Sequence, residues 1–435
     1  MEDSQPLAAT DARYCCPGES RPIDRATHLN RLATFYSGCR QCDQRVDIQQ
    51  LSTGQARQWS EILRRGAPRP RFAGEGMEAD SINDLECAVV ARLATSLSAH
   101  LWRQSGRCAA APAVLVGADG HWSTAEIAAA ACAALERAGC RTIDAGAVAT
   151  APLAACAHRM ATDAALWIGN ASGQPHTVAV RFWGRSGRPW SSPGALEPLR
   201  ELYESGVARP ARRGGTLERV EAEAPYRTAL APLFHALRPL RFVVDTLCRP
   251  LVQSLERLVA DAACEVLRLE ASATQTDGAA LAAPDATYVE RRLAIIRRQV
   301  AARQAHFGLW IDGAGESCRL VDQRGAAVDG ARLGRLLAGY VDRQRPMTAG
   351  ALEGGSADLA DRAPSRTCGQ DVGGATREAM AAAIESAGAV FASGPGDRFW
   401  FVDGVPAPDA LMAISLLLVI QSESDRPLSE VLDAA

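Results

Sequence analysis

Short apolar runs of strand length alternate with longer alanine-rich runs of helical length over much of this chain. The run 113–117 precedes a helical stretch at 125–138, and the run 164–169 follows another at 153–160. Strands that alternate with helices predict a largely parallel sheet with helices on both faces. We therefore expect an α/β fold. Further predicted strands are 142–145, 178–182, 240–245 and 307–312.

Length and charge narrow the class of protein. A chain of 435 residues predicts several domains, because single hydrophobic cores stop growing below that size. The formal charge of -3 gives no electrostatic reason to expect nucleic acid or an anionic membrane as a partner. The longest apolar run, 411–420, is shorter than the roughly 20 residues that span a bilayer. The first residues lack the basic and apolar regions of a secretory signal, so we expect a soluble, cytoplasmic protein.

The predicted strand 164–169 runs directly into Asn-Ala-Ser-Gly-Gln-Pro, which places Ser172 on the turn after a buried strand. A serine on such a turn can have a functional role. The alternative is that the serine is present only because turns favour this residue type.

This turn resembles the phosphoserine loop of the α-D-phosphohexomutases, the phosphoglucomutase/phosphomannomutase family. The family pattern there is Thr-Ala-Ser-His-Asn-Pro, which Ala171, Ser172 and Pro175 match. The resemblance extends over roughly residues 70 to 435. Further matches are Asp119 followed by Ser123 and Thr124, Asp144 and Gly146, Thr150-Ala151-Pro152, and Gly184 with Gly187-Arg188-Pro189.

The resemblance implies three consecutive phosphohexomutase-type α/β/α domains with mixed, largely parallel sheets. A small cysteine-rich segment precedes them, and we expect the fourth, phosphate-binding domain of the family to be absent. The predicted divisions are 1–66 for the cysteine-rich segment, 67–206 for domain I, 207–224 for a linker, 225–325 for domain II and 326–435 for domain III.

In the family, the loop serine carries a phosphoryl group that it transfers to a hexose phosphate beside a magnesium ion. The resemblance therefore implies that Ser172 is the catalytic residue. The family's metal loop is Asp-Gly-Asp-x-Asp-Arg, and this chain keeps Asp312 but has Ala314, Glu316 and Ser317 at the other three positions. Ser172, Asp312 and Glu316 could still bind magnesium, which often uses only one or two protein carboxylates. The alternative is a tight Asp-Gly turn that binds no metal.

The residues implied to contact substrate are also altered. The family's sugar loop, Gly-Glu-x-Ser-Gly-His, corresponds to Ser-Gly-Pro-Gly-Asp-Arg, which leaves Asp397 and Arg398 as candidate contacts. Arg319 could replace the arginine lost from the metal loop, and His121 keeps a positive charge at mildly acid pH. Glu78 stands where an arginine would face phosphate, and it should repel an anion. The alternative is that Asp397 and Arg398 lie in a solvated turn.

The cysteine-rich segment contains Cys39-Arg-Gln-Cys42, and such a knuckle can offer two thiolates to one tetrahedral metal. With Cys16 and His28, these residues would form a zinc site, for which Cys15 could replace Cys16. The alternative is a helical arm with reduced thiols, because the spacing fits none of the standard zinc-finger patterns.

The resemblance and these substitutions together leave two alternative functions. The first is a mutase-like phosphotransferase of carbohydrate metabolism whose activity on hexose phosphates is weak, altered or lost. The second is a non-catalytic pseudo-mutase that binds a sugar phosphate or a protein partner. Nucleic acid is disfavoured as a partner because the cysteine arm lacks a basic surface interleaved with aromatic residues.

Overall fold

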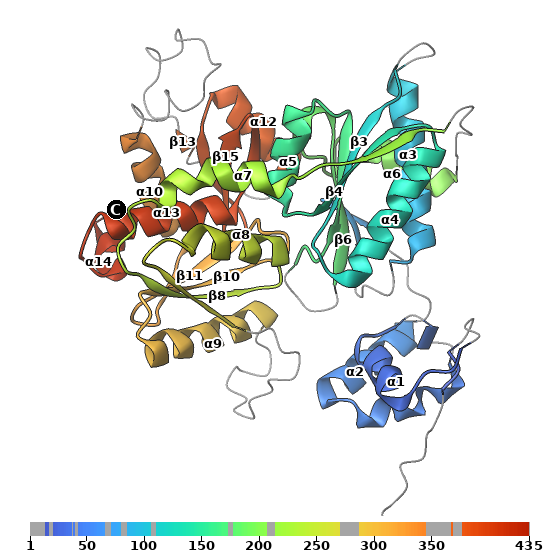
Figure 1. Ribbon diagram of the computed structural model, residues 1–435, viewed down its shortest axis with the longest axis horizontal. Helices are drawn as coiled ribbons and strands as arrows, with labels where there is room; N and C mark the ends of the chain where they lie inside the picture. The colour runs from blue at the N-terminus through green and yellow to red at the C-terminus, as the bar shows by residue number, and fades with distance from the viewer. Residues whose placement is uncertain are drawn as a thin grey trace, which may run out of the picture.

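The computed structural model shows three β-sheets that follow one another along the chain, each packed with helices (Figure 1). This arrangement confirms the predicted multi-domain α/β fold. Among the described residues, no helix is both long and apolar enough to cross a membrane. Positions 173–175 of the serine loop and 207–213 of the linker lie outside the described residues. The described residues are 14–16, 21–36, 38–39, 42–65, 71–79, 85–105, 110–172, 177–206, 214–269, 287–344, 367–368 and 376–434.

Domain I contains a seven-stranded mixed sheet in the order β1-β2-β6-β5-β3-β4-β7. Its centre is parallel, whereas β5 pairs antiparallel with β6, and β6 with β2. Helices α3 (Cys87–Ser105), α4 (Trp122–Arg137) and α6 (Glu197–Ser205) cover one face, and α5 (Thr150–Arg159) covers the other (Figure 1). The strands are β1 (Arg71–Ala73), β2 (Gly76–Ala79), β3 (Ala113–Ala118), β4 (Arg141–Ala147), β5 (Ala164–Gly169), β6 (Val178–Trp183) and β7 (Thr216–Arg219).

The central strands are buried on both faces, as their unbroken apolar sequences predict. In β3, Val114 and Val116 pack into the core under α3 and α4, while Leu115 packs into the core under α5. Because β3 and β5 are parallel neighbours, their C-terminal ends meet at one edge of the sheet. The polar residues Asp119 and Asn170 follow these two ends directly.

Strand β7 lies within the range that the sequence analysis predicted as a linker. It pairs in parallel with β4 and forms one edge of the domain I sheet. Gly215 makes this pairing possible, because a Cβ at that position would clash with the backbone of Cys140. The amide of Thr216 then donates a hydrogen bond to the Cys140 carbonyl oxygen at 3.1 Å. The glycine that indicated a linker therefore allows a close backbone approach instead.

Domain II contains a five-stranded sheet in the order β12-β11-β10-β8-β9. Helix α9 (Tyr288–Arg303) covers one face, and α8 (Arg249–Val259) belongs to the core on the other face. A short helix α7 (Glu223–Leu230) and the turn η5 (Ala231–Phe234) lead into the domain. The strands are β8 (Arg241–Thr246), β9 (Glu265–Arg268), β10 (Phe307–Ile311), β11 (Cys318–Asp322) and β12 (Ala327–Val328).

Domain III contains a four-stranded sheet in the order β13-β14-β15-β16. Its core is continuous with that of domain II, because the apolar helix α13 packs in a cluster that also contains Phe242 and Leu309. The strands are β13 (Thr367–Cys368), β14 (Phe391–Gly394), β15 (Arg398–Asp403) and β16 (Val405–Pro408). The helices are α10 (Gly330–Arg343), α12 (Arg377–Ala387), α13 (Ala410–Ser422) and α14 (Leu428–Asp433).

The N-terminal segment forms a small helical unit with its own core of Leu32, Phe35, Cys39 and Trp59. The indole nitrogen of Trp59 donates to the Leu32 carbonyl oxygen at 2.7 Å. Its elements are α1 (Arg25–Ala33), the 3-10 helix η2 (Asp43–Gln50) and α2 (Thr53–Arg65).

Candidate functional site

The serine loop begins at the C-terminal end of β5 and is tied to the end of β3 by Asp119. The carboxylate of Asp119 accepts hydrogen bonds from the Asn170 amide at 2.9 Å and from Thr124 Oγ1 at 2.5 Å. Ser172 is exposed, and its hydroxyl oxygen lies 2.6 Å from that of Thr177 on the other side of the loop. The candidate nucleophile is therefore at the surface, and its catalytic role stays a prediction.

The loop that follows β10 in domain II, residues 312–317, packs directly against domain I. We call this loop the metal-type loop. A Cβ at Gly313 would clash with the carbonyl oxygen of Asn170, so the metal-type loop and the serine loop are in contact. Thr150, at the start of α5, donates from its amide and its hydroxyl to the Ala314 carbonyl oxygen at 3.3 and 3.1 Å. These contacts hold the loop in a fixed position between the two domains.

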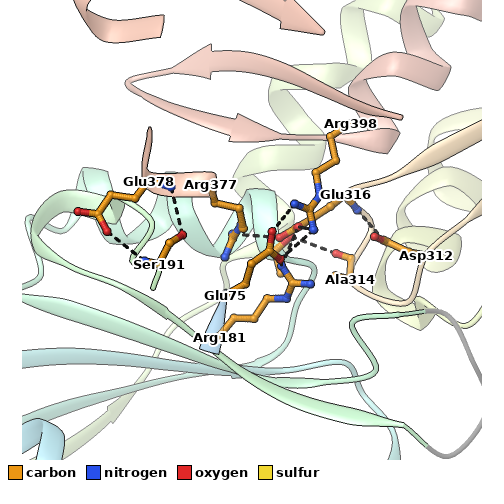
Figure 2. A network of polar contacts seen from close by, with 10 residues as sticks. Glu75, Arg181, Ser191, Asp312, Ala314, Glu316, Arg377, Glu378 and Arg398 are labelled. Carbon is orange, nitrogen blue, oxygen red and sulfur yellow. Dashed lines mark hydrogen bonds and ion pairs between the residues drawn. The ribbon is translucent and has the colours of Figure 1, made fainter. Parts of the chain in front are cut away.

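Glu316 in this loop is fully buried, and its carboxylate faces three guanidinium groups (Figure 2). Arg377 Nη2 lies 3.0 Å from Oε1, while Arg181 Nη1 and Arg398 Nη2 lie 3.1 and 3.4 Å from Oε2. Arg181 belongs to β6 of domain I, whereas Arg377 and Arg398 are the first residues of α12 and β15 in domain III. Glu316 thus joins all three domains.

A second carboxylate, that of Glu75, reaches two of these arginines, Arg181 and Arg398, from the tight turn between β1 and β2 (Figure 2). Arg398 donates to both Glu75 oxygens, through Nη1 to Oε1 and through Nη2 to Oε2, the latter at 2.8 Å, and Arg181 Nη1 also donates to Oε2. Bidentate arginine–carboxylate pairs are among the strongest hydrogen-bonded pairs in proteins. We call the five residues Glu75, Arg181, Glu316, Arg377 and Arg398 the ion cluster.

The charges of the cluster shift the acidity of its members. Burial opposes ionisation of Glu316, but the attraction of Arg181 and Arg377 outweighs it and holds the pKa of Glu316 below its usual value. Burial lowers the pKa of Arg377 to about 10, against the pull of Glu316. Burial and the neighbouring Glu316 charge raise the pKa of Asp312 to about 6. Glu316 is therefore an anion that its arginine partners stabilise.

The arrangement does not fit the magnesium site that the sequence resemblance implies. Both Glu316 oxygens face guanidinium nitrogens, and Asp312 Oδ1 accepts the Glu316 amide at 2.8 Å. A dication between Asp312 and Glu316 would face the positive charges of the cluster arginines. Within the described part of the chain, no group of three or more His, Cys, Asp or Glu side chains is placed to hold a metal ion. Magnesium binding by Ser172, Asp312 and Glu316 stays a prediction that this geometry does not support.

The four residues predicted to contact substrate do not form one set. Arg319 and Asp397 form an ion pair with each other, at 2.8 Å between Nε and Oδ2. Arg398 instead turns into the ion cluster. His121 precedes α4 as its N-cap and accepts a hydrogen bond from the Ser123 amide at 3.4 Å, and burial lowers the pKa of its imidazole.

Two further contacts close the domain interface around the cluster. Glu378 of α12 accepts hydrogen bonds from the amides of Ser191 and Ala195 in domain I, both at 3.0 Å. The Tyr226 hydroxyl donates to the buried carboxylate of Asp409, which also caps α13. Burial raises the pKa of Asp409 to about 6. The domains are thus joined by polar contacts that are mostly hidden from solvent.

Sequence reasoning missed Arg181, Arg377 and the role of Glu75. Arg181 carried a usable signal, because it is the one charged residue in the apolar strand Val-Ala-Val-Arg-Phe-Trp, in which every side chain is buried. A charge in such a strand requires a partner. Arg377 follows an ordinary helix cap at Thr376, and its sequence surroundings carry no comparable signal.

The predicted zinc ligands are buried, but they are not assembled as a metal site in the described part of the N-terminal unit. The His28 ring stacks on Tyr14 at 3.9 Å, and its Nε2 lies 3.5 Å from Asp47 Oδ2. Arg31 donates to the Cys16 sulfur at 2.9 Å. Zinc binding by Cys16, His28, Cys39 and Cys42 stays a prediction.

Comparison with known proteins gives one sequence match and several structural ones. Residues 69–195 match the family described as phosphoglucomutase/phosphomannomutase, alpha/beta/alpha domain I. No curated protein matches the chain. A phosphoglucomutase/phosphomannomutase family protein from Burkholderia thailandensis is similar in structure, with a TM-score of 0.64 and 20% identity over 83% of this chain and 79% of that protein.

Two other solved structures are similar over comparable lengths. A candidate phosphomannomutase from Thermus thermophilus gives a TM-score of 0.62 at 16% identity and covers 84% of this chain and 83% of its own. The open form of the exocytosis-sensitive phosphoprotein parafusin, a phosphoglucomutase from Paramecium, gives 0.54 at 11% identity over 85% and 76%. The similarity in fold therefore extends well beyond the first domain.

Proposed function

We propose that this chain, which its first α/β domain places in the phosphoglucomutase/phosphomannomutase family, is a non-catalytic member that binds a hexose phosphate. The family fold is kept through three domains, while the charges at their junction are arranged for internal pairing. The role that we assign is therefore recognition of a phosphorylated sugar without phosphoryl transfer.

The proposal rests on the ion pairs that Glu316 forms with arginines. Phosphoryl transfer requires cations that neutralise the charge on the moving group, and a divalent metal usually supplies them. Here Arg181, Arg377 and Arg398 take both oxygens of the carboxylate that the resemblance assigns to the metal. Breaking a buried ion pair by removing one partner costs about 3–5 kcal/mol. The metal would have to displace the arginines against that cost.

The closed domain interface supports the same conclusion. In the family mechanism a bisphosphorylated sugar must reorient between two half-reactions, so the substrate site must be large enough for the sugar to rotate. In this chain the Glu75–Arg398 and Glu316–Arg377 pairs hold domains I, II and III together beside the loop that the resemblance assigns to the metal. The Glu378 contacts with domain I reinforce that closure.

A residual mutase is the second candidate, and Ser172 favours it. The serine is exposed on a loop whose start is fixed by the Asp119 hydrogen bond to Asn170. This is the placement that a phosphoryl acceptor needs, because the acceptor must reach a substrate from a rigid support. Residual activity at Ser172 would require neutralisation by another group, such as Arg249, which reaches the Gly120 carbonyl oxygen at 3.4 Å.

A coupled assay decides between the two candidates. Glucose 1-phosphate and mannose 1-phosphate are supplied with magnesium and a hexose bisphosphate, and formation of the 6-phosphates is followed for wild type and Ser172→Ala. We expect equal, background rates for both proteins. Conversion by the wild type that disappears in Ser172→Ala would refute the non-catalytic proposal and establish a mutase.

Calorimetry tests the binding half of the proposal. We expect glucose 1-phosphate to bind saturably and free glucose to give no heat, because the arginines recognise the phosphoryl group. Absence of binding by folded protein would refute hexose-phosphate recognition and would leave a protein partner as the function to pursue.

A further inference from the structure

We propose that Arg181, Arg377 and Arg398 form a binding site for a phosphoryl group, and that Glu75 occupies this site as an internal anion. The inference rests on the proposed function only in taking the ligand to be a phosphorylated sugar. It adds the location of the site and the side chain that competes for it.

The ion cluster has more hydrogen-bond donors than acceptors. Each guanidinium carries five N–H donors, whereas a carboxylate offers about four lone-pair positions. Among the described residues, four buried donor atoms of the cluster, Arg181 Nε, Arg398 Nε, Arg377 Nε and Arg377 Nη1, have no hydrogen-bond partner, and neither does one acceptor atom, Glu316 Oε1. Arg377 is 1% exposed, and its guanidinium lies over the Trp183 ring at 4.7 Å. Buried donors without partners are costly, so the site lacks an acceptor-rich group.

The two carboxylates of the cluster differ in how firmly they are held. Glu316 is completely buried, and its backbone amide is bound to Asp312. Glu75 lies at the tip of a two-strand hairpin at the edge of the sheet, and its side chain is 23% exposed. Rotation of the Glu75 side chain toward solvent would free Arg398 Nη1 and leave Nη2 only its 3.4 Å contact with Glu316, without moving the backbone. Glu75 is therefore the displaceable anion.

A phosphoryl group matches the place that Glu75 would leave. Arginine binds carboxylate and phosphate with the same bidentate geometry, so the contacts of Arg398 to Glu75 can be made to phosphoryl oxygens. Three guanidinium charges would then face Glu316 alone, leaving two positive charges. A phosphate monoester carries about -1.5 to -2 at neutral pH and balances them.

The test compares wild type with Glu75→Ala by calorimetry at constant ionic strength, using inorganic phosphate, glucose 1-phosphate and glucose as probes. We expect Glu75→Ala to bind inorganic phosphate and glucose 1-phosphate about tenfold more tightly than wild type, which corresponds to one charge-assisted hydrogen bond gained. Free glucose should not bind to either protein. Tighter binding of glucose 1-phosphate than of phosphate would assign the ligand to a sugar phosphate, and equal binding would assign it to the phosphoryl group alone.

Two variants show whether the gain comes from the cluster. Adding Arg398→Lys to Glu75→Ala keeps the charge but removes the bidentate fork, and it should abolish the gain. Adding Arg319→Ala, which removes an arginine outside the cluster, should leave the gain intact. The proposal is overturned if folded Glu75→Ala binds phosphate no better than wild type, or if Arg398→Lys leaves the gain unchanged. Neither readout needs turnover, so mutase activity in the coupled assay would refute the proposed function and leave this result standing.

Discussion

The serine loop of domain I and the metal-type loop of domain II are in direct contact, yet they have very different environments. Ser172 is exposed and its loop starts from a polar anchor at Asp119. Glu316 has no exposed surface and is bound by arginines from the two other domains. The serine loop is therefore accessible from solvent, whereas the metal-type loop is part of the packed interior.

Under the proposed function, this difference is how the site changes its role while the fold is kept. Replacing a metal by guanidinium groups keeps the local charge balance but removes the open coordination positions on which metal-assisted chemistry depends. The carboxylate in the loop then acts as a structural anion. The contrast between the loops predicts that cluster residues contribute more to stability than other charged residues of the interface do.

Replacing Arg377 by leucine should produce the largest effect. The change breaks a buried ion pair, because it removes the guanidinium that lies 3.0 Å from Glu316 Oε1, while Oε2 keeps Arg181 and Arg398. We expect a loss of about 3–5 kcal/mol in the free energy of unfolding, measured by urea denaturation at neutral pH. The milder variant Arg377→Lys should recover part of this loss, because it keeps the charge. A loss below about 1 kcal/mol for the leucine variant would show that the cluster is not a structural centre.

Tyr226→Phe should have the next largest effect, because it removes the hydroxyl donor to the buried Asp409. An unsatisfied buried acceptor costs about 1–3 kcal/mol, which urea denaturation can resolve. Tyr203→Phe is the matched control, since the Tyr203 ring packs under Arg92 at 3.9 Å and keeps that contact without its hydroxyl. Equal losses in both variants would indicate that the Asp409 contact adds nothing specific.

The pH dependence of the free energy of unfolding tests the buried carboxyl of Asp409 separately from the ion cluster. Burial raises the pKa of this carboxyl from 3.8 to about 6 on folding, so the folded state holds the proton more tightly than the unfolded state does. Its contribution to stability is full below about pH 4 and is lost as the pH rises to about 6. Asp409→Asn cannot ionise and remains a good helix cap. The variant should gain about 1 kcal/mol relative to wild type between about pH 5 and pH 7.

Urea denaturation of both proteins at several pH values in this range provides the measurement. Asp312, whose pKa is also raised to about 6, is unchanged in the variant and contributes equally to both curves. Parallel stability curves for wild type and Asp409→Asn would contradict the assignment.

Arg319→Ala should have the smallest effect. Its pair with Asp397 has side chains that are 43% and 25% exposed, so solvent screens the interaction. We expect a change below about 1 kcal/mol in the same denaturation experiment. A loss as large as that of Arg377→Leu would remove the distinction between the cluster and the surrounding charges.

The framework of the fold could be predicted from sequence, because local patterns determine it. The apolar run 164–169 became β5 with the predicted bounds, and the run 113–117 became β3. Strand β7 was missed because its glycines resemble a linker until Gly215 is placed against Cys140.

The ion cluster could not be predicted in the same way, because its members lie far apart in sequence. Glu75 and Arg398 are separated by 323 positions, and no local pattern connects them. The changed residues Ala314 and Ser317 did indicate that the metal loop was altered. The ion pairs of Glu316 became visible only when Arg181 and Arg377 were placed beside it.

A calorimetric titration with magnesium tests most directly whether arginines have replaced the metal. Wild type and Asp312→Asn are titrated at neutral pH, with and without glucose 1-phosphate. We expect no saturable binding in any of these titrations, because the Glu316 carboxylate is held by Arg181 and Arg377. Saturable binding by wild type that Asp312→Asn abolishes would contradict this account and restore a working metal site.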